Sequence, residues 1–421
     1  MKIAAVAALL AVTSIGAIAY AQPAPMPAPA KAKKAAAAPA LKLERVVMMM
    51  RHGIRPPTKA VAVDKRYAPG IWPTWSVDYG LLTERGAAGA KLLGAADRAF
   101  YAKRGLFGAS GCPAPGSMML TASGKQRAIR TAENWRDGFM PGCKEEVTHP
   151  TEDGPDPIFH GLDDKPASFD GQRAYRDALK MAPGGNVDAD LKSYRADLQL
   201  LARVLDCKAP CALLTEPSKL VAVDHDRPEL DGPVDVGSTA SQTLLLEYLE
   251  GKPMSDVGWG RVTRPEIERL LRFHPLKFQY SNRPDYPARA AAAPLISAML
   301  DAMTKPGGAK LSLFAGHDTN IADLGGFLKV HWKVPSYPAD DVPPGSALGF
   351  EILKDGKGTR YVRAFYRAQT MDQLREQRDL TGKESPFRQY LPLPGCGNST
   401  AATACRLDAF AAWVKGRRIV L

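Results

Sequence analysis

Long apolar runs are nearly absent from this 421-residue sequence, and the one present lies at the N-terminus. No other segment is long and apolar enough to cross a bilayer, which takes roughly 20 such residues, so several membrane spans are excluded. No internal repeat is present, which excludes a repeat architecture. Hydrophobic residues make up 45% and charged residues 24% of the chain, close to globular averages. A disordered or fibrous protein is therefore excluded as well.

The N-terminal apolar run is typical of an export signal. Lys2 precedes a mostly apolar segment over residues 3–18, and Ala19-Tyr20-Ala21 matches the small-residue pattern of a cleavage site. The alternative is a membrane anchor, but the run is short for a span and two hydroxyl residues interrupt it. We therefore expect a signal peptide at residues 1–21 that is removed. The mature protein would then be periplasmic or secreted, without stable membrane insertion.

The rest of the chain divides into a linker and one folded domain. Residues 22–41 are rich in Pro, Ala and Lys, which predicts a flexible linker. Residues 42–421 form the predicted domain. The whole chain carries a net charge of +12, of which the lysines in the signal and linker contribute only four. A basic domain favours anionic ligands such as phosphate esters, nucleic acid or acidic lipid, but the charge also fits a solvated surface without a specific partner.

The sequence has few cysteines, which limits the number of metal sites and disulfide bonds that they can form. Cys207 and Cys211 have no second cysteine pair nearby, so their spacing does not indicate a zinc site. An even number of cysteines in an exported chain favours disulfide bonds. Six cysteines allow fifteen pairings in principle, and the simplest is sequential. It joins Cys112 to Cys143, Cys207 to Cys211, and Cys396 to Cys405.

The hydrophobic pattern predicts strands near both ends of the chain and helices in the middle. Short apolar runs predict strands over residues 43–50, 310–315, 348–353 and 361–366. Helical spacing predicts helices over residues 80–104, 123–139, 188–205, 239–249, 265–273 and 288–303. We therefore expect an α/β fold: a mixed-sheet core flanked by helices, with an inserted, mainly helical cap within about residues 145–295.

Three separate motifs combine into one hypothesis about chemistry. The first follows the strand at 43–50, so its side chains lie at the carboxyl end of that strand, where ligands bind in open α/β sheets. The motifs are Arg51-His52-Gly53-Ile54-Arg55-Pro56-Pro57-Thr58-Lys59, Gln126-Arg127-Ala128-Ile129-Arg130-Thr131-Ala132 and Gly316-His317-Asp318-Thr319-Asn320.

These residue types suit phosphate-ester chemistry without a metal. Arg51, Arg55 and Arg127 offer guanidinium groups that match phosphate oxygens and stay charged. Positive neighbours disfavour the imidazolium form, so His52 is expected to be a neutral nucleophile. The leaving oxygen needs a proton, for which Asp318 is the natural donor. The arginines favour the ionised form of Asp318, whereas a bound phosphate dianion offsets that effect, and turnover is therefore expected to be better at acidic pH.

Each motif by itself has a less specific interpretation. A lone Arg-His-Gly is frequent by chance, and Asp224-His225-Asp226 is only a weak metal-ligand cluster. No metal and no cofactor are therefore expected. The remaining histidines have no motif partners, so surface or core roles are expected for His149, His160, His274 and His331.

Taken together, the motifs resemble those of the histidine acid phosphatases, in the large branch of the histidine phosphatase superfamily. The likeness covers residues 43–414 and is nearest to bacterial periplasmic phytases and glucose-1-phosphatases. It extends through Leu324-Gly-Gly326, Pro343-Pro344-Gly345 and Gly258-Trp-Gly-Arg261. The resemblance implies an α/β domain with a helical cap, no metal, and disulfides that agree with the sequential pairing.

The resemblance also implies a role for each motif residue. His52 would be phosphorylated, Asp318 would protonate the leaving group, and phosphate would be held by Arg51, Arg55, Arg127 and His317. Arg127 is preferred to Arg130 because family members show Arg followed four residues later by a small hydroxyl residue, here Thr131. The residues implied in the substrate pocket are Thr58, Lys59, Gln242 and Thr319.

Two of these pocket residues bear on the subtype. Periplasmic phytases tend to carry a glutamate where this chain has Gln242, which leaves the phytate preference open, whereas Thr319 favours a phytase over a glucose-1-phosphatase. The leading hypothesis is an exported acid phosphomonoesterase, with phytate as the leading substrate and glucose-1-phosphate or another sugar phosphate as the alternative. A mutase-like phosphotransferase and a non-catalytic protein that binds phosphate or inositol phosphate are the competing hypotheses. We expect a monomer that binds a small phosphorylated substrate and no nucleic acid.

Overall fold

The apolar segment after the linker forms β1 (Lys42–Arg51), the central strand of a mixed sheet. Its side chains alternate between two cores, as expected for a strand that is buried on both faces. Val47 and Met49 belong to one cluster, and Val46, Met48 and Met50 to the other. Because both faces of the strand are buried, side chains on both faces are apolar, and the segment is therefore a continuous apolar run in the sequence.

The computed structural model describes residues 41–152, 154–162, 165–394 and 404–421. The predicted signal peptide and nearly all of the predicted linker therefore lie outside the described residues. Within the described part, no helix has both the length and the apolarity needed to cross a membrane.

Apart from two short 3-10 helices at Pro183–Gly185 and Val257–Gly260, the described residues form α-helices and strands in the following order. They are β1 (Lys42–Arg51), α1 (Glu84–Lys103), β2 (Met118–Ala122), α2 (Gln126–Phe139), β3 (Val147–Thr148), α3 (Gly171–Leu179), α4 (Val187–Ser193), α5 (Arg195–Leu205), α6 (Ala212–Thr215), β4 (Lys219–Val221), β5 (Glu229–Asp231), α7 (Pro233–Leu249), α8 (Arg264–Leu270), α9 (Phe273–Ser281), α10 (Asp285–Ala291), α11 (Ala293–Thr304), β6 (Leu311–Gly316), α12 (Asp318–Leu328), β7 (Ala347–Lys354), β8 (Arg360–Ala368), α13 (Met371–Glu376), β9 (Phe387–Leu391), β10 (Cys405–Arg406) and α14 (Leu407–Arg417).

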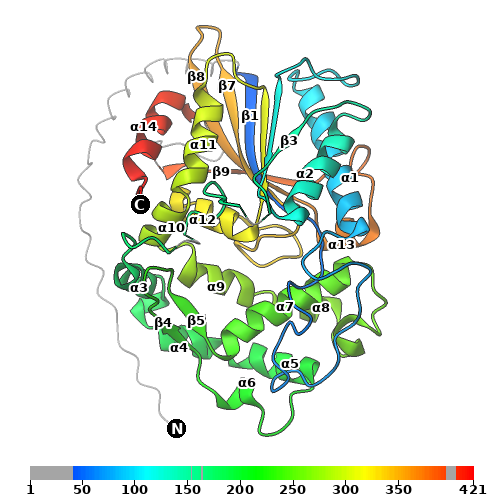
Figure 1. Cartoon of the computed structure of the whole chain (residues 1–421), viewed down its shortest axis with the longest axis vertical. Coiled ribbons are helices and arrows are strands. Elements are labelled where there is room, and N and C mark those ends of the chain that lie inside the picture. The colour runs from blue at the N-terminus through cyan, green and yellow to red at the C-terminus, as the bar shows by residue number, and fades with distance from the viewer. Residues whose placement is uncertain (1–40, 153, 163–164, 395–403) are drawn as a thin grey trace, which may run out of the picture. The chain divides into compact units, whose positions relative to one another are not determined.

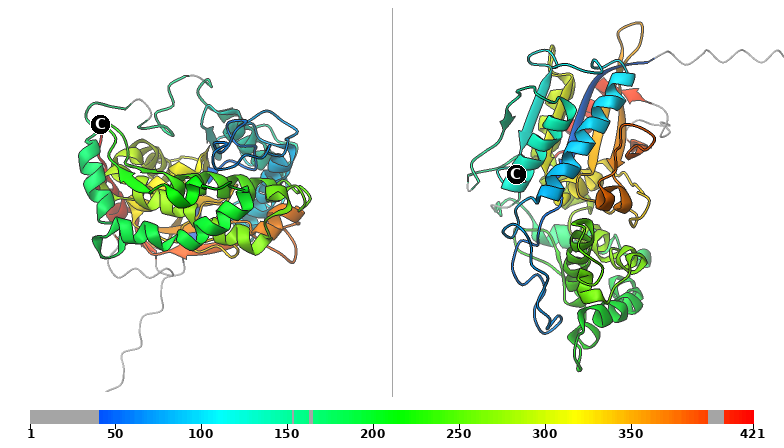
Figure 2. Two further views of the ribbon diagram at one scale, coloured as in Figure 1. Left: turned by 90° about the horizontal axis from the view of Figure 1, so that it is seen from below. Right: turned by 90° about the vertical axis from the view of Figure 1, so that its right-hand side faces the viewer.

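The main sheet confirms the predicted mixed α/β core. Its strand order is β10-β8-β7-β1-β6-β2-β3, with β9 also paired to β8. The pairs β1–β6, β2–β6 and β2–β3 are parallel, whereas β7, β8, β9 and β10 join by antiparallel pairing. Helices α1 and α2 lie side by side on one face, and α11 and α12 pack on the other face against β1 (Figures 1 and 2).

The helices of the middle segment gather at one end of the sheet. Figure 1 shows α7, α8 and α9 in green below the strands, together with α3 to α6. Helix α7 packs against α9, α8 and α5. We propose that this group is the predicted cap.

Several helix boundaries differ from the sequence-based predictions. The helix expected over 188–205 breaks at Tyr194, whose ring packs on Phe273 and lies under the Arg272 guanidinium. The helix expected over 288–303 is two helices, α10 and α11, because Pro294 lacks an N–H and favours a helix start.

Other elements begin earlier than predicted or were not predicted. Helix α7 starts at Pro233 instead of residue 239. The prediction gave one helix over 265–273, whereas the structure has α8 and then α9, which continues to Ser281. Helix α1 begins at Glu84, and the Thr83 side chain caps it by accepting a hydrogen bond from Gly86 N.

Two of the three predicted disulfides are present. Cys112 is bonded to Cys143 and Cys207 to Cys211. The third predicted pair includes Cys396, which lies outside the described residues, so its pairing with Cys405 stays a prediction.

Candidate active site

The three motifs meet at one edge of the sheet because the strands before them are parallel neighbours. Strand β6 pairs with β1 on one side and with β2 on the other, and Arg51 lies opposite Gly316. The loops that follow are tied together, since His52 N donates to Gly316 O at 2.8 Å and Ser123 N donates to Ala315 O at 2.9 Å. The carboxyl ends of β1, β6 and β2 therefore present His52, His317 and the start of α2 together.

The loop that carries His52 is held by α1 and α2. Gly53 N donates to Thr131 Oγ1 at 3.0 Å, and Thr131 Oγ1 donates to Arg127 O at 2.6 Å. On the other side Gly86 lies so close that a Cβ there would stand 2.3 Å from Ile54 O. This contact requires glycine at position 86 and limits the movement of the loop.

His52 is a neutral imidazole with one unprotonated ring nitrogen. It is buried, and its Nδ1 lies 2.9 Å from the Gly53 carbonyl oxygen, which can only accept, so Nδ1 carries the proton. Nε2 therefore keeps its lone pair, which accepts a long hydrogen bond of 3.5 Å from Arg55 Nε. Burial, and then the charges of Arg55, Arg127 and the other cations, hold the pKa of His52 well below its usual value.

The charges of three arginines, Arg51, Arg55 and Arg127, act on His52, and they have few counter-charges. Arg51 is 1% exposed and pairs with Asp318. Within the described residues, neither Arg55 nor Arg127 forms an ion pair with a carboxylate, and Arg127 Nε is a buried donor without a hydrogen-bond partner. Burial, and then the neighbouring arginines, lower the pKa of Arg55 to about 9. The site thus has an excess of buried and partly buried positive charge that an anion would neutralise.

Asp318 begins α12 beside these cations. Its Oδ2 lies 2.7 Å from Arg51 Nη2, and its Oδ1 accepts a hydrogen bond from Thr319 N at 2.9 Å. Burial alone would raise the pKa of this carboxyl, but Arg51, and then His274 and His52, outweigh burial and hold it below its usual value. Asp318 is therefore ionised in the free site.

His317, the histidine of the third motif, is buried next to His52. The two ring centroids are 5.7 Å apart, and His317 Nε2 lies 3.2 Å from Ser123 Oγ. Burial, and then Arg127 and His160, hold the pKa of His317 well below its usual value.

A cavity of about 410 Å³ opens from the motifs towards the middle segment. All four predicted pocket residues, Thr58, Lys59, Gln242 and Thr319, line it together with Arg51, Arg55 and Asp318. Gln242 lies on α7, and its Oε1 accepts a hydrogen bond from Arg51 Nη2 at 3.1 Å. Helices α7 and α9 supply the opposite wall, which adds Lys277 to the cations of the cavity.

Comparisons with known proteins agree with this geometry. Residues 42–179 match the family model of the histidine phosphatase superfamily (branch 2). The chain is 32% identical over 407 residues to phytase AppA of Escherichia coli (strain K12), which covers 90% of this chain and 93% of that protein. The chain belongs to the histidine phosphatase superfamily.

Further comparisons narrow the position of this phosphatase within the superfamily. It is 30% identical over 385 residues to a glucose-1-phosphatase of Salmonella typhimurium, which covers 88% of this chain and 91% of that protein. The solved phytase of Hafnia alvei in complex with tartrate has a TM-score of 0.84 and 32% identity, covering 91% of this chain and 98% of that one. The same phytase in complex with myo-inositol hexakis sulphate has a TM-score of 0.83. The phosphatase is thus a member of the histidine acid phosphatases.

The sequence did not predict every residue of the phosphatase site. His274 is buried and hydrogen-bonded as a core histidine would be, but it also lines the cavity from α9. His160 packs against His317, with ring centroids 5.1 Å apart. Neither has a sequence motif around it, so no local signal distinguished them from His149 and His331, which are exposed as expected.

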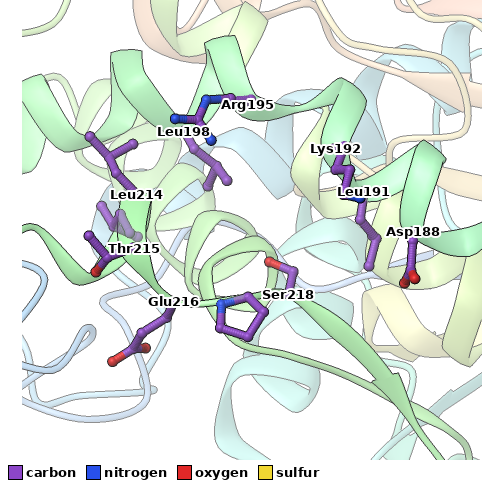
Figure 3. Close-up of a pocket in the computed structure, with 11 residues that line it drawn as sticks. Asp188, Leu191, Lys192, Arg195, Leu198, Leu214, Thr215, Glu216 and Ser218 are labelled. Carbon is purple, nitrogen blue, oxygen red and sulfur yellow. The ribbon is translucent and has the colours of Figure 1, made fainter.

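A second cavity of the phosphatase, about 390 Å³, lies away from the motifs. Figure 3 shows its lining from α4, α5, α6 and the segment after α6, with Lys192 from α4 and Arg195 from α5. It contains both Asp188 and Glu216, so it has no excess of positive charge, and none of the predicted site residues lines it. In the described residues no group of three or more His, Cys, Asp or Glu side chains is placed to hold a metal ion.

Proposed function

We propose that this phosphatase is an exported acid phosphomonoesterase that hydrolyses phytate through a phosphohistidine on His52. One observation carries the proposal. His52 Nε2 lies 3.5 Å from Arg55 Nε, and the charges of Arg51 and Arg127 also act on the ring; of these three arginines, only Arg51 has a carboxylate partner among the described residues. A nucleophile inside an uncompensated cationic site suits a phosphate ester, whose oxygens neutralise the charge while its phosphorus is attacked.

The first step forms a bond from His52 Nε2 to phosphorus and breaks the ester bond between phosphorus and the leaving oxygen. Arg51, Arg55 and Arg127 stabilise the charge that spreads over the three equatorial oxygens. The proton on Nδ1 remains bonded to the Gly53 carbonyl, so the ring becomes positively charged when it is phosphorylated. Asp318 gives a proton to the leaving oxygen, and the alcohol departs.

The second step hydrolyses the phosphohistidine. Asp318, now ionised, takes a proton from water as the water oxygen attacks phosphorus and the bond to Nε2 breaks. Inorganic phosphate leaves, and the lone pair on His52 is restored. Because Arg51 favours the ionised carboxylate, the first step requires that Asp318 gain a proton once the substrate is bound, and this favours acidic pH.

The shape and charge of the cavity support a substrate with several phosphates. Arg51, Arg55, Lys59 and Lys277 line it, against the single carboxylate of Asp318. Lys277 is paired with Asp235, whereas Lys59 is exposed and has no ion pair within the described part of the chain. Lys59 can therefore bind a second phosphate while the arginines hold the first. The solved relative in complex with myo-inositol hexakis sulphate fits this assignment.

The test is phosphate release at about pH 5 with a chelator present, using phytate, glucose-1-phosphate and p-nitrophenyl phosphate. We expect release from phytate to be fastest and His52→Ala to lose about 10³-fold or more of the activity. Arg127→Gln should lose most of the activity, whereas the matched control Arg130→Gln should not, because Arg130 is exposed and pairs with Glu133. Glucose-1-phosphate as the preferred ester would favour the alternative subtype. No release from any ester by the folded protein would leave only a binding role.

Two further readouts test the mechanism and the export. Rapid denaturation in alkaline detergent should trap phosphate on the wild-type chain but not on His52→Ala, since phosphohistidine is stable to alkali. Phosphate that appears on an added alcohol instead of in water would indicate a phosphotransferase. Sequencing of the mature protein should start at Gln22, and a retained Met1 would contradict the proposed signal cleavage.

A further inference from the structure

We propose that His274 and Asp341 form a positioning pair for Asp318, in which His274 holds the proton that Asp318 delivers to the leaving oxygen. The inference rests on the proposed function. Neither residue belongs to a motif, and both reach the site only through the fold: His274 from α9, and Asp341 from the segment before β7.

A closed ring of contacts joins the pair to the catalytic carboxylate. His274 Nδ1 lies 2.6 Å from Asp341 Oδ1, and its Nε2 lies 3.8 Å from Asp318 Oδ2. The same Oδ2 lies 2.7 Å from Arg51 Nη2. Arg51 Nη1 donates to the carbonyl of Val342, the residue that follows Asp341. The Asp341–Val342 segment therefore fixes both groups that flank Asp318.

Asp341 is a buried carboxylate with few partners. It is 0% exposed, and Oδ1 accepts from Val342 N at 2.9 Å as well as facing His274. Oδ2 is buried with no hydrogen-bond partner in the described residues. A buried carboxylate is stable when a cation compensates it, and His274 is the titratable base in direct contact with it. This contact orients the ring and directs Nε2 at Asp318.

The first step of the proposed reaction requires a proton on Asp318. Arg51 holds Asp318 in the ionised form, so Asp318 by itself has no proton to give in the free site. When phosphate neutralises the arginines, a proton on His274 Nε2 can pass to Asp318 Oδ2 and then to the leaving oxygen. In the second step water returns a proton to Asp318, which passes it back to His274. The 3.8 Å separation must shorten, as contacts in substrate-free sites commonly do.

The charged groups around His274 come from four elements. Asp341 faces Nδ1, and Asp318 faces Nε2 from the start of α12. Lys277 from α9 and Arg55 from the His52 loop line the same cavity, and Lys277 is paired with Asp235 of α7. The rest of the ring packs on Phe278 at 4.4 Å between centroids. Of these charged groups, only the two carboxylates lie within 4 Å of the ring nitrogens.

The experiment compares two substrates in His274→Gln. Phytate has an alkoxide leaving group that needs a proton, whereas p-nitrophenolate leaves without one. We expect kcat for phytate to fall about 10- to 100-fold and kcat for p-nitrophenyl phosphate less than about threefold, with KM changed little for either. Equal losses on the two substrates, or no loss on either, would overturn the proposal.

Further variants separate the proton role from a structural one. His274→Ala should regain phytate turnover when imidazole is added, and Asp341→Asn should move the alkaline limb of the kcat profile to lower pH. The matched control is His331→Gln, because His331 also lies 2.6 Å from an aspartate, Asp340, but is 71% exposed. No imidazole rescue together with an unshifted profile would reject the pair. A wild-type protein without phosphatase activity would instead reject the proposed function.

Discussion

Arg51 and Asp318 form an ion pair of 2.7 Å that joins the ends of two adjacent parallel strands, β1 and β6. The two steps of the proposed reaction require opposite protonation states of Asp318, and the ion pair favours only one of them. Arg51 keeps the carboxylate ionised and oriented, as the second step of the proposed reaction requires, yet the first step requires the protonated acid. Substrate binding allows both states, because the negative charge of the phosphate compensates the positive charge of Arg51 and weakens its effect on Asp318.

The loss of kcat on substitution of Asp318 should therefore depend on the leaving group of the substrate. In Asp318→Asn we expect kcat for phytate to fall about 10²- to 10⁴-fold, since the alkoxide loses its proton donor. The loss for p-nitrophenyl phosphate should be much smaller in the first step, which a burst of p-nitrophenol in rapid-mixing kinetics would reveal. A burst that is slowed as much as phytate hydrolysis would contradict the role of Asp318 as acid.

Lys59 should contribute to phytate binding and not to chemistry. Lys59→Gln removes a cation from the cavity wall, so KM for phytate should rise about fivefold, equivalent to about 1 kcal/mol, while kcat for p-nitrophenyl phosphate stays unchanged. The control is Lys192→Gln in the other cavity of Figure 3. If the Lys192 variant raises KM and the Lys59 variant does not, the assigned cavity is wrong.

Glu247 should make the protein less stable as the pH rises. Its side chain is 0% exposed, and Oε2 accepts from Gly258 N at 3.0 Å. Burial raises its pKa to about 7 despite that hydrogen bond, so the folded state binds a proton that the unfolded state has lost. The free energy of unfolding should therefore fall between about pH 4.5 and pH 7, by about 3 kcal/mol in total.

Glu247→Gln tests this linkage. The amide oxygen keeps the bond to Gly258 N, and no charge needs to be buried. Urea unfolding should show the variant to be more stable than wild type at pH 8 and about equally stable at pH 4, whereas exposed Glu146→Gln changes neither. An equal gain at both pH values would mean that packing, and not ionisation, is responsible.

The two disulfides should contribute unequally to stability. Cys112–Cys143 closes a separation of 31 residues and Cys207–Cys211 a separation of 4. The chain-entropy relation assigns about 4 kcal/mol to the first and about 2 kcal/mol to the second. Paired Cys→Ser variants should thus differ in urea midpoint, with the 112/143 variant less stable. Equal midpoints would show that unfolded-chain entropy does not dominate.

Some features followed from local sequence alone. The apolar run at 43–50 predicted β1, and the residues directly after it had to lie at the carboxyl end of that strand, which placed Arg51, His52 and Arg55 together. The same reasoning placed His317 and Asp318 after β6. Chain order and strand direction were sufficient because these side chains are adjacent to the strands that carry them.

Other features depended on partners far along the chain. The helix predicted over 188–205 breaks at Tyr194, which packs against Phe273 and Arg272 from a distant part of the chain. Strand β2 is a run of five residues, too short to be distinguished by pattern, and it becomes a strand because β6 pairs with it.

The sequence by itself determined the strand-end motif, the excess of positive charge and the chemistry that His52, Asp318 and the arginines can perform. Only the tertiary structure decided which cap residues face that motif. It brought His274 and Asp341 to Asp318 and left Arg55 and Arg127 without carboxylate partners in the described residues. The physical reason is that local side-chain types set what a group can do, whereas burial and the pairing of charges depend on contacts between segments more than 200 residues apart, such as the Arg51–Asp318 pair.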